Sequence, residues 1–323
     1  MFKPLRTSTV LLGLFTACLA AIVLRLSLGP GGLSIPDSAD LWSLRLTRAS
    51  VGVVVGAALG AGGVLLQALL RNPLASPDIM GLSSGAGLAV IAGAFVAYSL
   101  NTQALPAAPL ALLGSIAALA LVYSLSRRRG LIDPVTMVLV GVIISIMCAA
   151  AGLLLQSLLP DRGLATVRWL LGSIDESTTP GRIASLAALA AVIIAASVRL
   201  GPTIDAACLG DDEAVSVGVP LARLRVFLFL ASGTLTAAAV ILAGPIGFVG
   251  LVCPHLVRLA IGPAHRPLIL GSSLAGATLV VLADALVRAL DTSAGRLPIG
   301  VITSLLGGPL LIALLRRPHH ADR

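Results

Sequence analysis

The run PVTMVLVGVIISIMCAAAGLLLQSL, residues 134–158, contains no charged side chain and decides the class of fold. It is longer than the ~20 residues with which an α-helix crosses the hydrocarbon core of a bilayer. Its apolar residues are continuous, whereas a strand of a membrane β-barrel alternates apolar and polar residues. We therefore expect this run to form a transmembrane α-helix.

Comparable runs fill the rest of the chain. Of its 323 residues, 57% are hydrophobic and 11% are charged, with a mean hydropathy of +1.04, whereas soluble domains carry about 25% charged residues. The sequence therefore predicts an all-α polytopic membrane protein with about ten transmembrane helices, forming a single domain over residues 1–323. The other nine predicted spans lie near 8–28, 49–70, 79–100, 106–126, 182–200, 226–243, 246–262, 268–290 and 298–315.

The basic residues indicate how these spans are oriented. With the N-terminus inside, fourteen of the 22 Lys and Arg residues fall on the inner side, in agreement with the excess of basic residues in cytoplasmic loops. We expect both termini in the cytoplasm. We attribute the net charge of +8 to this bias and not to a nucleic-acid-binding surface, because only 3% of the residues are aromatic.

The sequence lacks the motifs of an ATPase or a metal site. Its only lysine is Lys3, which excludes a phosphate-binding loop of the form GxxxxGK[ST]. No metal-ligand spacing joins the four His and four Cys residues, which are His255, His265, His319, His320, Cys18, Cys148, Cys208 and Cys253. We expect no enzymatic activity and no metal or cofactor bound directly by the chain.

One carboxylate lies inside a predicted span. Asp284 stands four residues before Arg288, a spacing that places both on one face of a helix. The pair is either structural or part of a proton relay, although a relay usually contains more carboxylates at membrane depth. The sequence is therefore typical of a conduit that depends on a separate motor.

The segment LGDDEAVSVGVP, residues 209–220, is too short to cross a bilayer. We expect a short helix whose first turn holds three acids, with Gly218 as a left-handed cap and Pro220 as the stop. A helical wheel places Asp212, Glu213 and Ser216 on one side and Ala214, Val215 and Val217 on the other. Either a partner covers the apolar side or the helix is an ordinary solvated loop helix.

Proline and glycine interrupt the chain at two further places. In RNPLASPDIMGLSSGAG, residues 71–87, Pro73 and Pro77 forbid continuation of the helix, so the chain turns at the inner surface. The glycine spacing of GPIGFVG, residues 244–250, predicts a broken segment that is buried or lines a cavity. His255 follows this segment and is either a structural residue or a ligand for a substrate or metal.

The three segments 71–87, 209–220 and 244–250 resemble the permease subunits of ABC importers for iron–siderophore complexes, haem and cobalamin. The same resemblance extends to LADALVRAL (282–290) and LPIGVITSLLGGP (297–309). The resemblance implies the type II importer permease fold, in the cell inner (cytoplasmic) membrane. It also implies three kinds of partner, namely a second permease subunit (an identical copy or a close paralogue), two cytoplasmic ATPase subunits that use ATP and Mg, and an extracytoplasmic substrate-binding protein.

The resemblance also assigns roles to individual residues. It implies that the acidic helix is the coupling helix for the ATPase, formed by Leu209, Gly210, Asp211, Asp212, Glu213, Ala214, Val215, Val217 and Gly218. It implies that Arg71, Asn72 and Pro73 face the ATPase, the alternative being a plain rigid turn. It implies that Arg45, Arg48 and Arg288 receive acidic side chains of the binding protein, the alternative being contact with lipid headgroups.

Two further assignments concern the pathway. We expect the fifth span to line it, with an inner gate formed by Asp133, Pro134, Val135 and Thr136. Arg296 stands where the family usually carries an acid, and we expect it at the outer mouth. The substrate that we expect is a ferric siderophore, with haem or cobalamin as alternatives. A different class of protein, an ion-driven secondary transporter or channel, is the alternative to an ATP-driven importer.

Overall fold

The computed structural model describes residues 6–29, 32–103, 105–128, 131–159, 169–174, 178–290 and 297–315. Two short antiparallel hairpins, β1 (Leu28–Gly29) with β2 (Gly32–Leu33) and β3 (Arg127–Arg128) with β4 (Leu131–Ile132), accompany the helices. The helices are α1 (Thr7–Ser27), α2 (Ala39–Leu70), η1 (Pro77–Met80), α3 (Leu82–Ser99), α4 (Ala107–Leu125), α5 (Pro134–Ser157), α7 (Pro180–Arg199), α8 (Gly201–Ala207), α9 (Asp211–Ser216), α10 (Leu221–Ala243), α11 (Val249–Ile261), α12 (His265–Ala289) and α13 (Ile299–Leu315).

The predicted all-α membrane architecture is confirmed. Within the described ranges, eight helices are long and apolar enough to cross a membrane: α1, α2, α3, α4, α5, α7, α10 and α12. The eighth and tenth predicted spans correspond to α11 and α13, which are shorter apolar helices. Helix α2 begins ten residues before the predicted span, because the Ser38 hydroxyl caps it by accepting a 3.3 Å hydrogen bond from the Leu41 N–H.

Helix α2 lies at the centre of the bundle and packs against α10, α11 and α12. Glycines make this packing close. A Cβ atom on Gly56 would lie 2.2 Å from the carbonyl oxygen of Gly276, and one on Gly60 would lie 2.0 Å from that of Ser272. Since lipid provides no hydrophobic drive for helix association, such backbone contact is an important source of attraction between these helices.

The break predicted between α10 and α11 is confirmed. Helix α10 ends at Ala243, and α11 begins at Val249. Gly244 and Phe248, at the two ends of the break, have positive φ angles of 65° and 68°. A positive φ at both positions turns the chain out of one helix and into the next.

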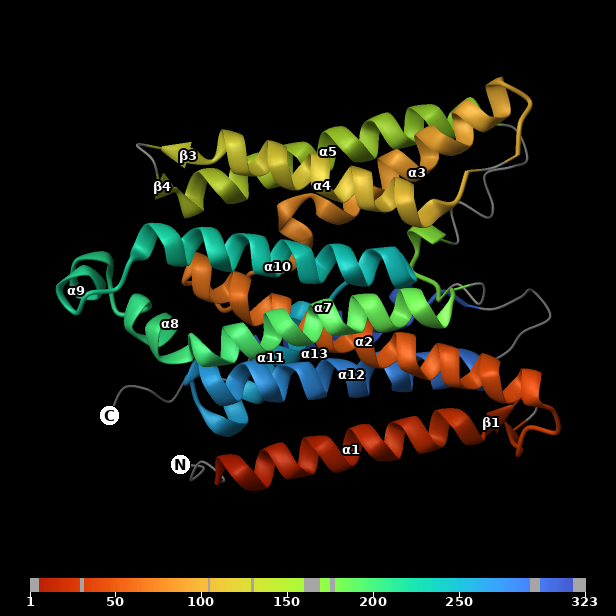
Figure 1. Cartoon of the computed structure of the whole chain (residues 1–323), viewed down its shortest axis with the longest axis horizontal. Coiled ribbons are helices and arrows are strands. Elements are labelled where there is room, and N and C mark those ends of the chain that lie inside the picture. The colour runs from red at the N-terminus through yellow and green to blue at the C-terminus, as the bar shows by residue number, and fades with distance from the viewer. Residues whose placement is uncertain are drawn as a thin grey trace.

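The helices lie roughly parallel and form layers (Figure 1). Helices α3, α4 and α5 lie together along one edge, α10 separates them from α2 and α12, and α1 packs on α12 at the opposite edge. The end of the bundle that carries α9 also holds the start of α1 and the β3–β4 hairpin, and we call it the α9 end. The start of α2 and the β1–β2 hairpin lie at the other end, here the β1 end.

Candidate functional site

Helix α9 projects from the bundle between α8 and α10. Asp211, Asp212 and Glu213 form its first turn, as predicted, so negative charge lies beside the free N–H groups of the helix start. Gly218 follows Val217, the C-cap of the helix, and has the positive φ that was predicted for it, 84°. The short acidic helix is therefore present with the boundaries that its sequence indicates.

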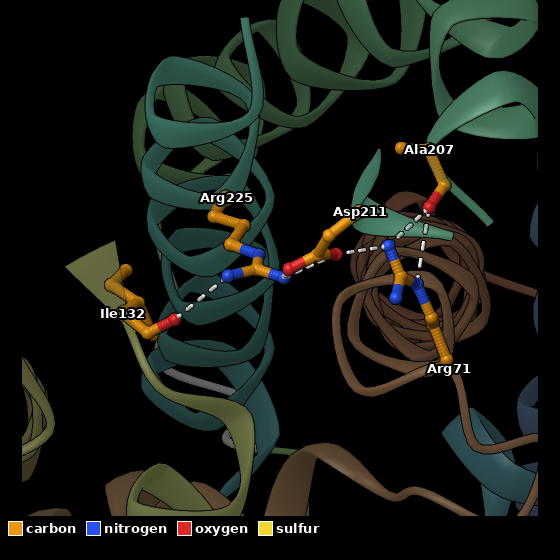
Figure 2. A network of polar contacts seen from close by, with 5 residues as sticks. All are labelled: Arg71, Ile132, Ala207, Asp211 and Arg225. Carbon is orange, nitrogen blue, oxygen red and sulfur yellow. Dashed lines mark hydrogen bonds and ion pairs between the residues drawn. The ribbon is translucent and has the colours of Figure 1, made fainter. Parts of the chain in front are cut away.

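A pair of arginines holds α9 against the bundle (Figure 2). Arg71, the left-handed cap of α2, donates from Nη2 to Asp211 Oδ1 at 2.5 Å and to the Ala207 carbonyl oxygen at 2.6 Å. Arg225, on α10, donates from Nη2 to both Asp211 oxygens at 2.8 and 2.7 Å, and from Nη1 to the Ile132 carbonyl oxygen at 3.5 Å. One carboxylate thus joins the end of α2 to the start of α10.

The electrostatics of Asp211 follow from these contacts. Partial burial tends to raise the pKa of its carboxyl group. The hydrogen bonds and positive charges of Arg71 and Arg225 outweigh that effect and hold the pKa below its usual value. Asp211 is therefore ionised at neutral pH, and the clamp formed by Asp211, Arg71 and Arg225 is intact there.

The clamp leaves a set of apolar side chains uncovered on this chain. Leu209, Val215 and Val217 are 75%, 61% and 67% exposed. The prediction that Ala214 shares this uncovered side is wrong, because Ala214 is fully buried and belongs to the hydrophobic core. The helix rests on the bundle through this small side chain, while Asp212 and Glu213 are exposed.

The turn after α2 is rigid and exposed. The Asn72 N–H donates to the Gln67 carbonyl oxygen at 3.1 Å, and its side-chain oxygen accepts from the Leu74 N–H at 2.9 Å. Arg71, Asn72 and Pro73 are all exposed at the α9 end. The structure thus contains the rigid turn, and the ATPase-facing role of these residues stays a prediction.

The residues predicted to form an inner gate begin α5. The Asp133 Oδ2 atom accepts a 2.9 Å hydrogen bond from the Thr136 N–H, and this bond caps the start of the helix. The same atom accepts from the Thr136 hydroxyl group. Pro134 occupies the first turn, where its missing N–H costs no hydrogen bond. Val135 is 68% exposed. A gating role for these four residues stays a prediction.

Two adjoining cavities of about 380 and 490 Å³ lie between α3, α5, α13 and the α10–α11 break. They share Ser83, Ser84, Leu170 and Pro245, and most of their other lining residues are apolar or small. Asp78 lines the larger one and accepts 3.2 Å hydrogen bonds from the hydroxyl groups of Ser76 and Ser83.

Asp78 was not among the predicted site residues. Its only signal in the sequence is an acid that follows Pro77 at the start of an apolar run. The chain turns back after α2, and η1 packs against α5 and α3, which carries this carboxylate into the bundle. The sequence shows the turn, but it does not show where the turn leads.

At the β1 end, Asp284 joins three helices. Its carboxylate pairs with Arg25 of α1 and lies 2.5 Å from Nη2 of Arg48 on α2. Arg45 is also turned inward and donates from Nη1 to the carbonyl oxygens of Leu26 and Ser34 at 2.6 and 2.7 Å. The sequence indicated Arg288 as the partner of Asp284, and it gave no sign of Arg25 or of this three-helix link.

Comparison with known proteins assigns the fold to a family. Residues 10–317 match the FecCD transport family. The chain belongs to this family. The FecCD chain also resembles a solved structure described as an inward-facing conformation of a metal-chelate type ABC transporter, with a TM-score of 0.83 and 29% identity, over 97% of this chain and 100% of the other. The resemblance drawn from the sequence and the type II importer fold are thus confirmed.

Curated FecCD relatives have different named substrates. The vitamin B12 import system permease of Vibrio cholerae is 38% identical, over 97% of this chain and 95% of the relative. The hemin transport system permease of Yersinia pestis is 37% identical, over 86% and 83%. The Fe(3+)-citrate import system permease of Bacillus subtilis is 33% identical, over 91% and 90%.

The structure brings some of the predicted site residues of this FecCD protein together and separates others. Arg71 and the acidic helix meet at the α9 end. The predicted docking residues Arg45 and Arg48 belong to the first turns of α2, and the start of α2 lies at the β1 end. Arg45 and Arg48 are only 6% and 7% exposed, so docking through them stays a prediction. Arg296, predicted at the outer mouth, lies outside the described residues.

Proposed function

We propose that this protein is the membrane permease subunit of an ATP-driven importer for a metal chelate. The observation that carries the proposal is the α9 surface, where Val215 on the helix and Leu209 and Val217 beside its two ends are exposed. The Asp211 clamp fixes this helix to the bundle. Exposed apolar side chains on a rigid support are typical of a contact surface for another protein. The names of the FecCD relatives support an importer.

The clamp suggests how a motor acts on the helices. An ATPase subunit that binds α9 moves the Asp211 carboxylate, and with it Arg71 at the end of α2 and Arg225 at the start of α10. Helix α10 packs on α2, α3 and α4, so this displacement reaches the helices around the two cavities. Most of α2 and α10 is buried. Because buried side chains are closely packed, these helices are stiff enough to transmit the displacement.

The proposed arrangement places the α9 end in the cytoplasm. Two ATPase subunits bind there and use ATP and Mg, and this chain binds no cofactor of its own. A substrate-binding protein docks at the β1 end, on the other side of the inner membrane. Few side chains of α5 are buried within this chain, and Val135, Leu139 and Ile146 are exposed, which supports pairing with a second permease subunit.

The substrate class that we propose is a preformed metal chelate. The cavities are lined mainly by apolar and small residues, with serines, Gln156 and Asp78 as the polar residues of the lining. Our expectation from the sequence was a ferric siderophore. The relatives named for vitamin B12, hemin and Fe(3+)-citrate have identities of 38, 37 and 33%, which are too similar to favour one of these chelates.

Reconstitution tests the proposal. The permease is placed in proteoliposomes with its ATPase and binding protein, and uptake of cobalamin, hemin, ferric citrate and a ferric hydroxamate siderophore is measured. We expect uptake of one chelate class, dependent on ATP and on both partners. Uptake by the permease alone down an ion gradient would instead establish a secondary transporter or channel.

A further inference from the structure

The Asp78 carboxylate has acceptor capacity that its hydrogen bonds within the chain do not use. Its Oδ2 atom accepts from the Ser76 hydroxyl group and its Oδ1 atom from the Ser83 hydroxyl group, both at 3.2 Å. Hydroxyl donors of this kind favour the ionised form of a carboxyl group. An ionised carboxylate has about four acceptor sites, so these two bonds leave sites for further donors.

The α10–α11 break leaves this carboxylate open to the larger cavity. Gly247 of the break lines that cavity together with Asp78 and Ser304. A Cβ atom on Gly247 would lie 3.8 Å from Asp78 Oδ2 and 3.6 Å from Ser304 Oγ. A larger side chain at this position would lie against both groups, so the glycine keeps them accessible to a solute in the cavity.

A carboxylate at the wall of a cavity distinguishes solutes by their outer groups. It accepts strong, charge-assisted hydrogen bonds from ammonium or amide N–H groups, and it repels another carboxylate. These effects are larger in a cavity lined mainly by apolar residues than in water. Metal chelates differ in this respect, since cobalamin carries outer amide groups and some hydroxamate siderophores a terminal ammonium group, whereas hemin and citrate carry carboxylates.

We propose that Asp78 is a specificity-determining residue that selects chelates by these outer groups. Its carboxylate favours the passage of a chelate with a cationic or N–H donor group and disfavours one with free carboxylates. The proposal rests on the proposed importer function and narrows the substrate class within it. The expected substrate is a cobalamin or a cationic hydroxamate chelate.

Charged thiol reagents measure this selectivity without transport. Ser84, which lines both cavities, is changed by Ser84→Cys in a full-length permease whose four native cysteines are replaced by alanine. Modification by a cationic ammonium and by an anionic sulfonate methanethiosulfonate is timed, and each rate is divided by the rate for free cysteine. We expect the ratio of cation to anion to exceed one, and Asp78→Asn to lower it roughly tenfold.

The matched control is Asp212→Asn, which removes an equal charge from the exposed α9 helix and lines neither cavity. It should leave the ratio unchanged. Equal changes in the two variants would overturn the proposal, as would a ratio below one with Asp78 present. A Ser84→Cys thiol that reacts with neither reagent would also overturn it, because the cavity would then be closed to solutes.

Uptake by the reconstituted complex gives a second readout. The wild type should import cobalamin or a hydroxamate chelate with a terminal ammonium group, and Asp78→Asn should lower that uptake roughly tenfold. Import of hemin or ferric citrate in preference to these chelates would contradict the proposal. A complex that imports no chelate with ATP and both partners would overturn the proposed function alone, because the thiol measurement does not depend on transport.

Discussion

The Asp211 carboxylate lies 2.5 Å from Nη2 of Arg71, although 140 positions separate the two residues. The contact joins an exposed helix to the end of the most buried span, and Arg225 completes it from α10. We expect Asp211→Asn to weaken transmission from an ATPase to these spans. Uptake should fall roughly tenfold, which corresponds to about 1.4 kcal/mol, while ATP hydrolysis continues.

The control for this experiment is Asp212→Asn. Asp212 is exposed in the same helical turn and takes no part in the Asp211 clamp. Its substitution changes net charge equally but leaves the clamp intact, so its loss of uptake should be clearly smaller than that of Asp211→Asn. Equal losses in both variants would mean that charge alone, and not the clamp, supports transport.

The same clamp predicts a dependence of stability on pH. Because the arginines hold the pKa of Asp211 below its ordinary value of 3.8, folding favours its ionised form. The stabilisation is therefore fully present above pH 3.8 and is lost as the pH falls through the lower pKa of the folded protein. The Tm difference between wild type and Asp211→Asn should be constant near neutral pH and shrink below about pH 3.8. A difference as large at pH 2 as at neutral pH would contradict this assignment.

Two neighbouring positions on α9 should respond in opposite ways. Val215 is exposed, so Val215→Asp should change the free energy of unfolding by no more than about 0.5 kcal/mol, as is usual for surface substitutions. The same variant should abolish coupling of ATP hydrolysis to uptake. Ala214 is fully buried, so Ala214→Leu should overpack the contact and destabilise the protein by about 1–3 kcal/mol. Thermal unfolding and coupled uptake assays separate the two effects, and normal transport by Val215→Asp would exclude α9 as the ATPase contact.

How far the sequence predicts this protein depends on the range of the interaction involved. The spans follow from uninterrupted apolar runs, and the first turn of α9 follows from local charge, since both are properties of neighbouring residues. The break after α10 follows from the spacing of its glycines, although Phe248 also takes a left-handed conformation there.

Tertiary contacts could not be predicted in this way. Asp284 stands one helical turn from Arg288, but Arg25, with which it pairs, is 259 positions away. Helix packing alone decides that contact, as it decides that Ala214 and not Val215 faces the bundle. The position of Asp78 likewise depends on where the turn after α2 enters the bundle.

Asp78 is the carboxylate of the larger cavity, and its charge should matter for passage of the substrate. Asp78→Asn keeps the size of the side chain. Its amide oxygen can accept from one of the two hydroxyl groups of Ser76 and Ser83, and its NH2 group can donate to the oxygen of the other. It removes a charge that is costly to hold inside the bundle, so Tm should stay equal or rise. Uptake should fall by roughly tenfold if this charge contributes about 1.4 kcal/mol to passage, with ATPase activity retained. Unchanged uptake of every chelate tested would show that Asp78 has only a structural role.

Asp284 should be the most sensitive of these acids to substitution. It is 1% exposed and pairs with Arg25 and Arg48, which are themselves buried. Asp284→Asn removes the charge that pairs with these two buried guanidinium groups, and losing one partner of such a pair costs about 3–5 kcal/mol. We expect a fall in Tm of more than about 5 °C, whereas Asp37→Asn, which neutralises an exposed acid at the same end, should change Tm little. A Tm for Asp284→Asn equal to that of the wild type would mean that this ion pair does not hold α1 and α2 to α12.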